Sequence, residues 1–242
     1  GYLAHGIPFE VILVNPQEFY YHLLTSTGSK AHRFRILDGL KTAPPASFES
    51  EAHLYQHLQM SYIHPELRED QGEIEAAQEN RLPDLVELRD IKGDLHVHSN
   101  WSDGSSSLAE LAEAARLRGY QYIAITDHSH SLPITGGLNP ERLILQAQLI
   151  DKLNQQQPGL HILRGIEVDI LKDGSLDLSD ADLEQLDIVI ASVHSHFRLN
   201  REEQTRRLLR AIENPHVDII GHLTGRMLNK RSGYEFDLER IL

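Results

Sequence analysis

Residues 93–104 read Gly93-Asp94-Leu95-His96-Val97-His98-Ser99-Asn100-Trp101-Ser102-Asp103-Gly104. Residues 94–98 predict a short strand. Because successive residues of a strand point to opposite faces, His96 and His98 are expected on the same face. The next segment, Ser107-Leu108-Ala109-Glu110, forms a capping box and predicts a helix that ends at Gly119. A strand followed directly by a helix indicates the start of a βα unit.

The same alternation continues toward the C-terminus. Helices are predicted over 140–156 and 201–213, and further strands over 122–126, 161–166, 188–193 and 217–220. Strands that alternate with helices imply a parallel sheet or barrel. We therefore expect an α/β fold for residues 91–242.

Each predicted strand ends in a histidine or an acidic residue. These residues, together with Asp103 in the first loop, are His96, His98, Asp127, His128, Glu167, His194 and His222. In parallel βα barrels the active site is built at the carboxyl ends of the strands, so side chains far apart in the sequence can meet there. A hydrogen-bonded structural role is the ordinary interpretation of one such histidine, and we give it to His130, His161, His196 and His216. Five successive strands with this ending indicate a site.

The side chains in this pattern favour metal binding. The chain has 15 histidines and no cysteine, so a metal would be held by His, Asp and Glu, a set that suits Zn, Mn or Fe. Metals held close together by a shared carboxylate neutralise phosphate oxygens and activate water, which is the chemistry of phosphoester hydrolysis. Asp127 could be a ligand or could orient one.

The first 90 residues are less regular. A strand is expected over 9–14, helices over 16–24 and 53–59, and a loop over 41–45. Residues 66–80 are strongly charged and poor in apolar side chains, which favours a linker over 66–90, with a solvated helix as the alternative. The N-terminal part is therefore expected to be a small α+β module.

The overall composition narrows the class of protein. The sequence has no apolar run of membrane-spanning length, so no membrane association is expected. The lack of cysteine fits a cytoplasmic protein. The net charge of −13 argues against a generic nucleic-acid binder, because such proteins usually present a basic face, although a local basic patch would be compatible with it.

Five ordered motifs resemble those of the PHP (polymerase and histidinol phosphatase) family. They are residues 93–104, Ile125-Thr126-Asp127-His128-Ser129, Gly165-Ile166-Glu167, Ser192-Val193-His194-Ser195 and Gly221-His222. The resemblance implies a distorted, TIM-like (βα)7 barrel and a metal-dependent phosphoesterase. That family ends in an Asp-x-His motif after a further strand, which does not occur before Leu242, so the barrel is expected to be C-terminally incomplete.

The subtype is similar to the PHP module of bacterial family X DNA polymerases. The supporting segments are residues 101–104, Thr135-Gly136-Gly137-Leu138 and His222-Leu223-Thr224-Gly225-Arg226, although that family usually has Pro at the position of Leu223. Upstream, Thr27-Gly28-Ser29-Lys30 resembles a turn of the polymerase thumb, and residues 62–69 resemble the segment that joins thumb and PHP domain. Residues 1–65 thus resemble a thumb-like module, 66–90 a linker, and 91–242 the PHP domain.

The resemblance assigns the ligands of up to three metals. His96, His98 and Glu167 would hold the first with the absent Asp, and Glu167, His194 and His222 the second. Asp103 and His128 would hold the third with the absent His. Arg226 is a candidate phosphate clamp.

The implied function is 3′-5′ exonuclease activity or 3′-end processing of DNA in repair. Polymerase activity is not expected from these residues, because the palm and its catalytic aspartates are absent from the sequence, and Thr25-Ser26 replaces the Tyr-Phe of the thumb. Two alternatives remain open: a small-molecule phosphatase of the histidinol-phosphatase type, and a non-catalytic structural platform.

Overall fold

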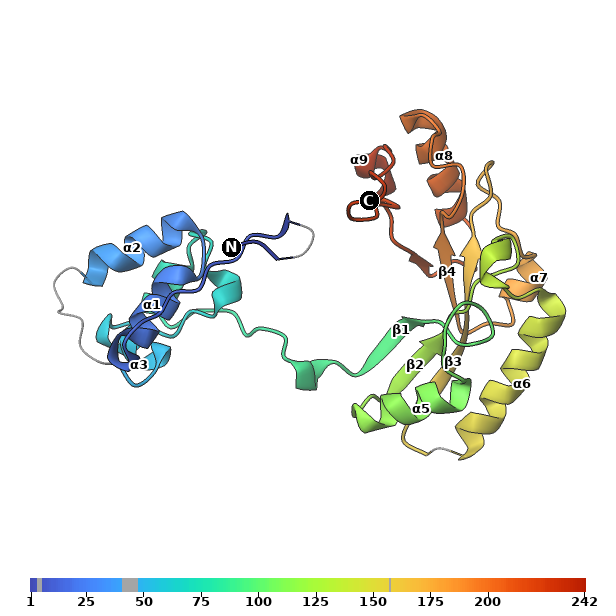
Figure 1. Ribbon diagram of the computed structural model, residues 1–242. Helices are drawn as coiled ribbons and strands as arrows, with labels where there is room; N and C mark the ends of the chain where they lie inside the picture. The colour runs from blue at the N-terminus through green and yellow to red at the C-terminus, as the bar shows by residue number, and fades with distance from the viewer. Residues whose placement is uncertain (4–5, 41–47, 157) are drawn as a thin grey trace. The chain divides into compact units, whose positions relative to one another are not determined.

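The computed structural model describes residues 1–3, 6–40, 48–156 and 158–242. The chain divides into two compact units, Gly1–Leu85 and Val86–Leu242 (Figure 1). The loop predicted over 41–45 lies outside the described residues.

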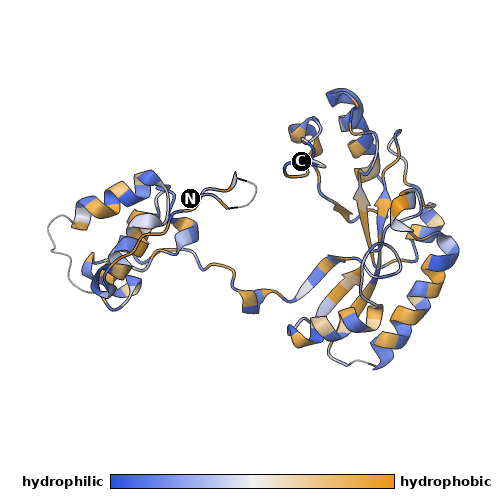
Figure 2. Ribbon diagram, viewed as in Figure 1, coloured by the Kyte–Doolittle hydropathy of each residue, from blue (hydrophilic) through white to orange (hydrophobic). Residues whose placement is uncertain are grey.

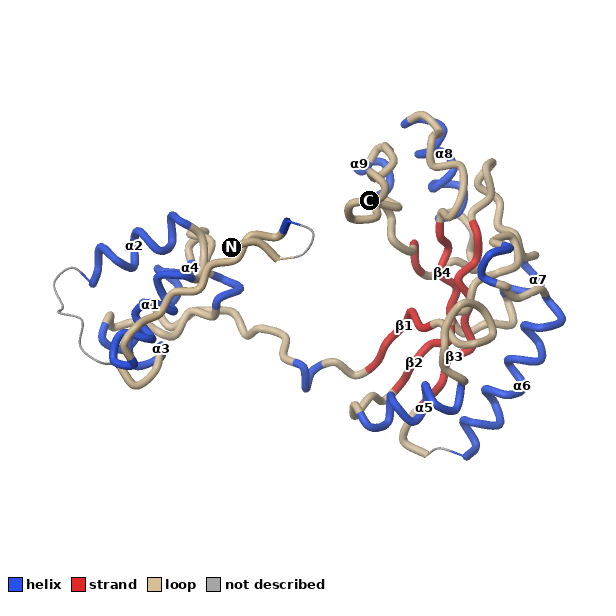
Figure 3. The backbone as a smooth tube through the Cα atoms, in the orientation of Figure 1, coloured by secondary structure: helices blue, strands red, loops and turns tan. Residues whose placement is uncertain are grey.

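The second unit is built on one parallel five-stranded sheet (Figure 3). Its strands, in spatial order, are β1 (Gly93–Val97), β2 (Tyr122–Ile125), β3 (His161–Asp169), β4 (Ile188–Ser192) and β5 (Ile219–Ile220). Each strand pairs with its neighbour in the sequence, which is the order of a βα barrel, whereas a doubly wound sheet reverses its order at a switch point. The described residues contain five strands of this sheet, so the expected number of seven stays a prediction.

Helices connect the strands as predicted. α5 (Leu108–Leu117) follows β1, α6 (Pro140–Gln156) follows β2, and α8 (Arg201–Ile212) follows β4. Capping boxes at Ser107 and Asn200 satisfy the free N–H groups that open α5 and α8. The shorter elements are η4 (Leu88–Asp90), η5 (Pro133–Thr135), α7 (Asp180–Leu183) and α9 (Leu238–Ile241).

Helices pack on the sheet of this unit through two apolar clusters. Every residue of β4 is buried, as expected for a central strand of a parallel sheet. One apolar cluster joins β3 and β4 to α8, and a second joins β2 to α5 and α6. Figure 2 shows the central strands as largely hydrophobic, while the helices carry hydrophilic residues among hydrophobic ones.

The first unit is a helical module in its described residues. Its elements are η2 (Pro16–Glu18), α1 (Phe19–Ser26), α2 (Lys30–Leu40), α3 (Glu51–His57), η3 (Pro65–Leu67) and α4 (Glu73–Gln78). The strand predicted over 9–14 is wrong. Phe9 exchanges backbone hydrogen bonds with Gly1, but none of residues 9–14 belongs to a strand, and β propensity without a neighbouring strand does not make one. The β character of the expected α+β module is therefore not found there.

The predicted linker also needs correction. Residues 66–85 belong to the first unit, and α4 buries Ile74 and Ala77 against the core that contains Leu24 and Leu54. Two apolar residues on a six-residue helix are too weak a pattern to stand out from the surrounding charges. The solvated-helix alternative is correct about the helix but not about its exposure.

A buried arginine fixes the turn between α1 and α2. Arg68 is fully buried, and its Nε–H donates to the carbonyl of Ile63 at 3.0 Å. Its Nη1 contacts Thr27 Oγ1 and lies 3.0 Å from Glu51 Oε1. Gly28 has φ +87°, and a Cβ there would lie 2.5 Å from Cβ of Arg68. The two segments that resemble the polymerase thumb and its junction thus pack directly on each other.

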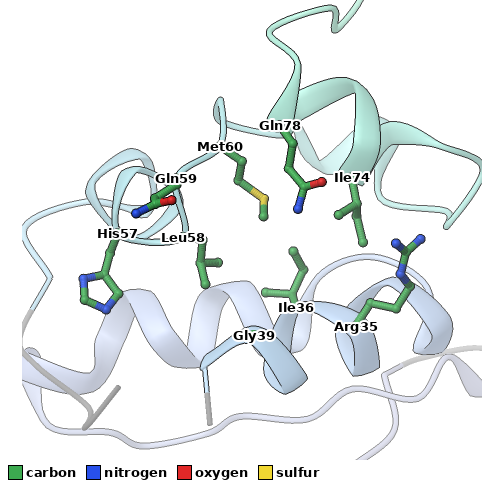
Figure 4. A pocket seen from close by; sticks show the side chains of 9 residues that line it. All are labelled: Arg35, Ile36, Gly39, His57, Leu58, Gln59, Met60, Ile74 and Gln78. Atoms are coloured by element: carbon green, nitrogen blue, oxygen red, sulfur yellow. The ribbon is translucent and has the colours of Figure 1, made fainter. Parts of the chain in front are cut away.

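The first unit contains a cavity of about 320 Å³. Figure 4 shows the side chains that line it. Ile36, Leu58, Met60 and Ile74 give it an apolar lining. The guanidinium of Arg35 at its rim is paired with Asp70 and Glu75, so its charge is already engaged.

The sequence predicts no segment that crosses a membrane, and the length and polarity of the helices bear on this prediction. Among the described residues, no helix combines the length and the apolar character needed to cross a membrane.

Candidate metal centre

The carboxyl ends of the five strands bring the predicted side chains together. His96 and His98 lie on one face at the end of β1, with stacked rings whose centroids are 5.1 Å apart. The ring of His98 is 4.5 Å from that of His128, which is 4.9 Å from that of His194. The ring of His222 lies 5.0 Å from that of His194 and closes the group.

Backbone pairing beyond the strands sets the position of His128. The N–H of Glu167 donates to the carbonyl of Asp127 at 3.0 Å, and the N–H of Ser129 donates to the carbonyl of Glu167 at 3.0 Å. The parallel pairing between β2 and β3 therefore resumes three residues beyond Ile125, the end of β2, and places His128 beside Glu167. Nδ1 of His128 lies 3.1 Å from Oε2 of Glu167.

Glu167 stands at the centre of the group and is only 1% exposed. Its two carboxylate oxygens face different imidazoles. The nitrogens around Oε2 belong to His96 at 3.4 Å, His98 at 3.4 Å and His128 at 3.1 Å. Those around Oε1 belong to His194 at 3.3 Å and His222 at 2.9 Å. A carboxylate with one oxygen toward each set has the geometry needed to bridge two ions.

Asp103 adds a third set of donors. Its Oδ1 lies 3.2 Å from Nδ1 of His98, and its Oδ2 lies 3.6 Å from Nε2 of His128. The seven predicted side chains therefore form one connected group at this edge of the sheet, each in contact with at least one other. Three groups have ligand atoms that lie mutually within 4.8 Å: His96, His98 and Glu167; His98, Asp103 and His128; and His128, Glu167 and His194.

The electrostatics favour a positive charge next to Glu167. Burial raises the pKa of this carboxyl, but hydrogen bonds from His194, His222 and His96 outweigh burial and hold the pKa far below its usual range. Burial also lowers the pKa of His194, yet its contacts with Asp169 and Glu167 raise it to about 9. The pKa of His128 is lowered, mainly by burial, which favours the neutral imidazole that binds metals.

Two ring nitrogens of the group are placed for binding a metal ion and not for hydrogen bonds to the neighbouring carboxylates. Nδ1 of His98 and Nδ1 of His128 are buried and make no hydrogen bond, although carboxylate oxygens lie 3.2 and 3.1 Å away. Their contact geometry is therefore not that of a hydrogen bond. Buried polar atoms without a partner are rare in folded proteins and call for an explanation such as an ion. Imidazole and carboxylate together suit divalent transition metals.

Asp127 acts on the first loop and does not contact the histidines directly. Its buried carboxylate accepts hydrogen bonds from the N–H of Ser99 at 2.8 Å, from the hydroxyls of Ser99 and Ser102 at 2.5 Å, and from Nε2 of Gln146 at 2.6 Å. These bonds fix the loop that carries Asp103. Of the two predicted roles, the geometry matches the orienting one.

Asp169 is a contact of the site that the sequence analysis missed. It ends β3, and its Oδ1 accepts a hydrogen bond from Nδ1 of His194. The sequence predicts a strand that ends at Ile166, but β3 continues to Asp169. The period of two that pairs His96 with His98 also puts Asp169 on the face of Glu167, and this signal could have found it.

The backbone before His222 has little room. A Cβ on Gly221 would lie 2.2 Å from Oγ of Ser192 and 3.6 Å from Oε1 of Glu167. His222 itself has φ +25°, an uncommon value for a residue with a side chain. Such strained positions cluster at functional sites.

The remaining candidates lie outside this group. Arg226 is exposed in the segment after β5, where its N–H donates to Oγ1 of Thr224. Nδ1 of His130 lies 3.8 Å from Asp177, and His161 begins β3 at the opposite end of the sheet. His196 and His216 are likewise absent from the three groups of possible ligands.

Comparison with known proteins matches this arrangement to one family. The family model of the PHP domain matches residues 94–239. The chain belongs to the PHP domain family. It is 42% identical over 245 residues to the DNA polymerase/3′-5′ exonuclease PolX of Bacillus subtilis. The aligned region covers 95% of this chain and 43% of that protein.

Other PHP relatives are named as phosphatases. A probable phosphatase of Caldanaerobacter subterraneus subsp. tengcongensis is 37% identical over 154 residues, covering 62% of this chain and 56% of that protein. The chain thus spans about half the length of the curated relatives it matches. A solved histidinol phosphate phosphatase of Lactococcus lactis, in complex with zinc, L-histidinol and phosphate, aligns with a TM-score of 0.39 and 21% identity over 55% of this chain and 58% of that one.

Proposed function

We propose that this protein is a metal-dependent phosphoesterase that processes 3′ ends of DNA as a 3′-5′ exonuclease. The observation that carries the proposal is the position of Glu167, whose two oxygens face separate sets of imidazoles. Up to three divalent ions, of Mn, Zn or Fe, would be held there. They would neutralise the charge of the phosphate and activate water.

Each side chain has a role in this proposal. His96 and His98 would hold one ion with Oε2 of Glu167, and His194 and His222 another with Oε1. Asp103 and His128 would hold a third. Arg226, in the exposed segment after β5, would contact a phosphate of the substrate.

DNA is favoured as the substrate by the relationship to PolX of Bacillus subtilis, which extends over 95% of this chain and so includes the helical first unit. The phosphatase names of other relatives support the small-molecule alternative. The convergence of all seven donors supports a working site over a structural platform.

The test is an assay of phosphoester hydrolysis with Mn²⁺ on two substrates, a 5′-labelled single-stranded oligonucleotide and a small phosphomonoester. The proposal predicts shortening of the oligonucleotide from its 3′ end. His98→Ala should lower the rate by at least about 10–100-fold, the cost of disturbing even a residue that supports a ligand. His216→Ala, at the opposite end of the sheet, is the matched control.

Two other results of this assay would favour the alternative functions. Hydrolysis of the phosphomonoester with untouched DNA would replace the exonuclease by a phosphatase. Full metal binding without hydrolysis of either substrate would favour the platform.

A further inference from the structure

His194 is held between two carboxylates of the same strand. Oε1 of Glu167 lies 3.3 Å from its Nε2, and Oδ1 of Asp169 accepts a hydrogen bond from its Nδ1. Glu167 and Asp169 are two positions apart on β3, with Val168 between them, so both point from one face of the sheet toward the ring. The two ring nitrogens therefore have different partners.

The backbone of Asp169 is itself fixed. Its N–H donates to Oγ of Ser129 at 3.0 Å and to Oδ1 of Asp177 at 3.0 Å. Asp177 also accepts from the N–H of Ser131 at 2.9 Å. Asp169 is only 7% exposed, so neither water nor rotation of the strand end easily displaces its carboxylate.

This contact determines which nitrogen of His194 can bind an ion. A neutral imidazole carries one proton, and a proton on Nδ1 leaves the lone pair on Nε2. Nε2 lies 3.2 Å from Nε2 of His222, on the side of Oε1 of Glu167. Carboxylates that accept the second N–H of a ligating histidine fix its orientation and raise its basicity.

We propose that Asp169 is a positioning residue of the metal centre, which holds Nδ1 of His194 so that Nε2 faces the ion shared with Glu167 and His222. The inference rests on the proposed metal-dependent function. It adds a residue that contacts neither metal nor substrate but acts through His194.

The test is a Co²⁺ titration of the full 242-residue chain, followed by the visible absorption of the bound ion. Asp169→Ala should weaken the binding of one ion by about 10–100-fold and alter its spectrum. Asp169→Asn keeps an acceptor for the Nδ1 proton of His194 but removes the charge. The affinity of this variant for Co²⁺ should therefore lie between that of the unchanged chain and that of Asp169→Ala. Asp173→Asn, whose side chain contacts Ser175 and Arg210, should bind as the unchanged chain does.

A double-mutant cycle separates positioning from a general effect on the fold. In a His194→Ala background, Asp169→Ala should change the affinity by less than about twofold, because interacting residues are not additive. An equal loss in both backgrounds, or unchanged affinity in Asp169→Ala alone, would overturn the inference while the proposed function stands. If the unchanged chain binds no Co²⁺, the proposed function fails first. Circular dichroism and the fluorescence of Trp101 verify that each variant is folded.

Discussion

Nε2 of His222 lies 2.9 Å from Oε1 of Glu167, although 55 residues separate the two in the sequence. The contact joins the last strand of the sheet to the third, across β4. It completes a ring of five imidazoles around one buried carboxylate. Glu167 therefore presents one carboxylate oxygen to His194 and His222 and the other to the remaining three histidines.

Replacing this carboxylate should cost more metal than replacing any single histidine. Glu167→Gln removes a shared ligand and the negative charge that balances the ions, whereas one histidine contributes to fewer contacts. Elemental analysis of purified variants after dialysis measures the difference, with exposed Glu141→Gln as the control. Equal metal content in Glu167→Gln and the unchanged protein would refute a bridging role.

Gly221 should tolerate no side chain. A Cβ there would lie 2.2 Å from Oγ of Ser192 and 3.0 Å from Cγ2 of Ile190, so Gly221→Ala forces the segment before His222 to move. We expect a loss of about 1–3 kcal/mol of stability, the usual cost of overpacking, together with weaker metal binding. Thermal unfolding and metal titration measure both.

Gly39→Ala is the matched control for this substitution. A Cβ at Gly39 meets Leu58 at an ordinary 3.5 Å, and alanine favours a helix such as α2. Equal losses in the two variants would contradict the steric argument.

The first unit should lose stability in acid through Glu73. Burial raises the pKa of this carboxyl, but hydrogen bonds with His32 and with the N–H groups of Gln71 and Asp70 outweigh burial and lower it. The stabilisation is therefore present above the pKa of an unfolded glutamate, about 4.3, and is lost as the pH falls through the lower folded value.

Glu73→Gln tests this pH dependence. We expect the variant to be less stable by about 1–3 kcal/mol at pH 7, with the difference shrinking as the pH falls below about 4. Hydrogen exchange of the amides in α2 and α4 reports on this unit separately. A difference that does not change with pH would show that the charge is not responsible.

Arg142 should control the loop that carries Asp103. Its guanidinium donates to the carbonyls of Gly136, Gly137 and Trp101 at 2.5, 3.0 and 2.6 Å. Arg142→Lys keeps the charge but cannot make this planar set of bonds. We expect a shift in the fluorescence of Trp101 and metal binding weakened several-fold. Arg118→Lys, which loses one bond to the carbonyl of Ala114, should change neither.

The sequence predicts the second unit well because its signals are local. The capping box at Ser107, the helix over 140–156 and the apolar run of β4 are each visible within one segment. The convergence of the histidines follows from one general rule about parallel strands. The carboxylate of Asp127 points toward Ser99 and Ser102 and supports their loop. The spacing of residues in the sequence does not determine this side-chain orientation.

The first unit is predicted less well because its structure depends on distant contacts. Arg68 reaches Thr27 across 41 residues, and no sequence pattern links the two. Residues 9–14 have the composition of a strand, but a strand requires a partner. Asp169 was missed for a smaller reason, the three further residues over which β3 continues.

In the proposed site, Glu167 bridges ions held by two sets of histidines. Anomalous X-ray diffraction from crystals soaked in Mn²⁺ tests it most directly. We predict one peak between Oε1 of Glu167 and Nε2 of His194 and His222, and another between Oε2 and the rings of His96 and His98. Peaks that avoid Glu167, or Mn²⁺ bound only at surface carboxylates, would contradict it.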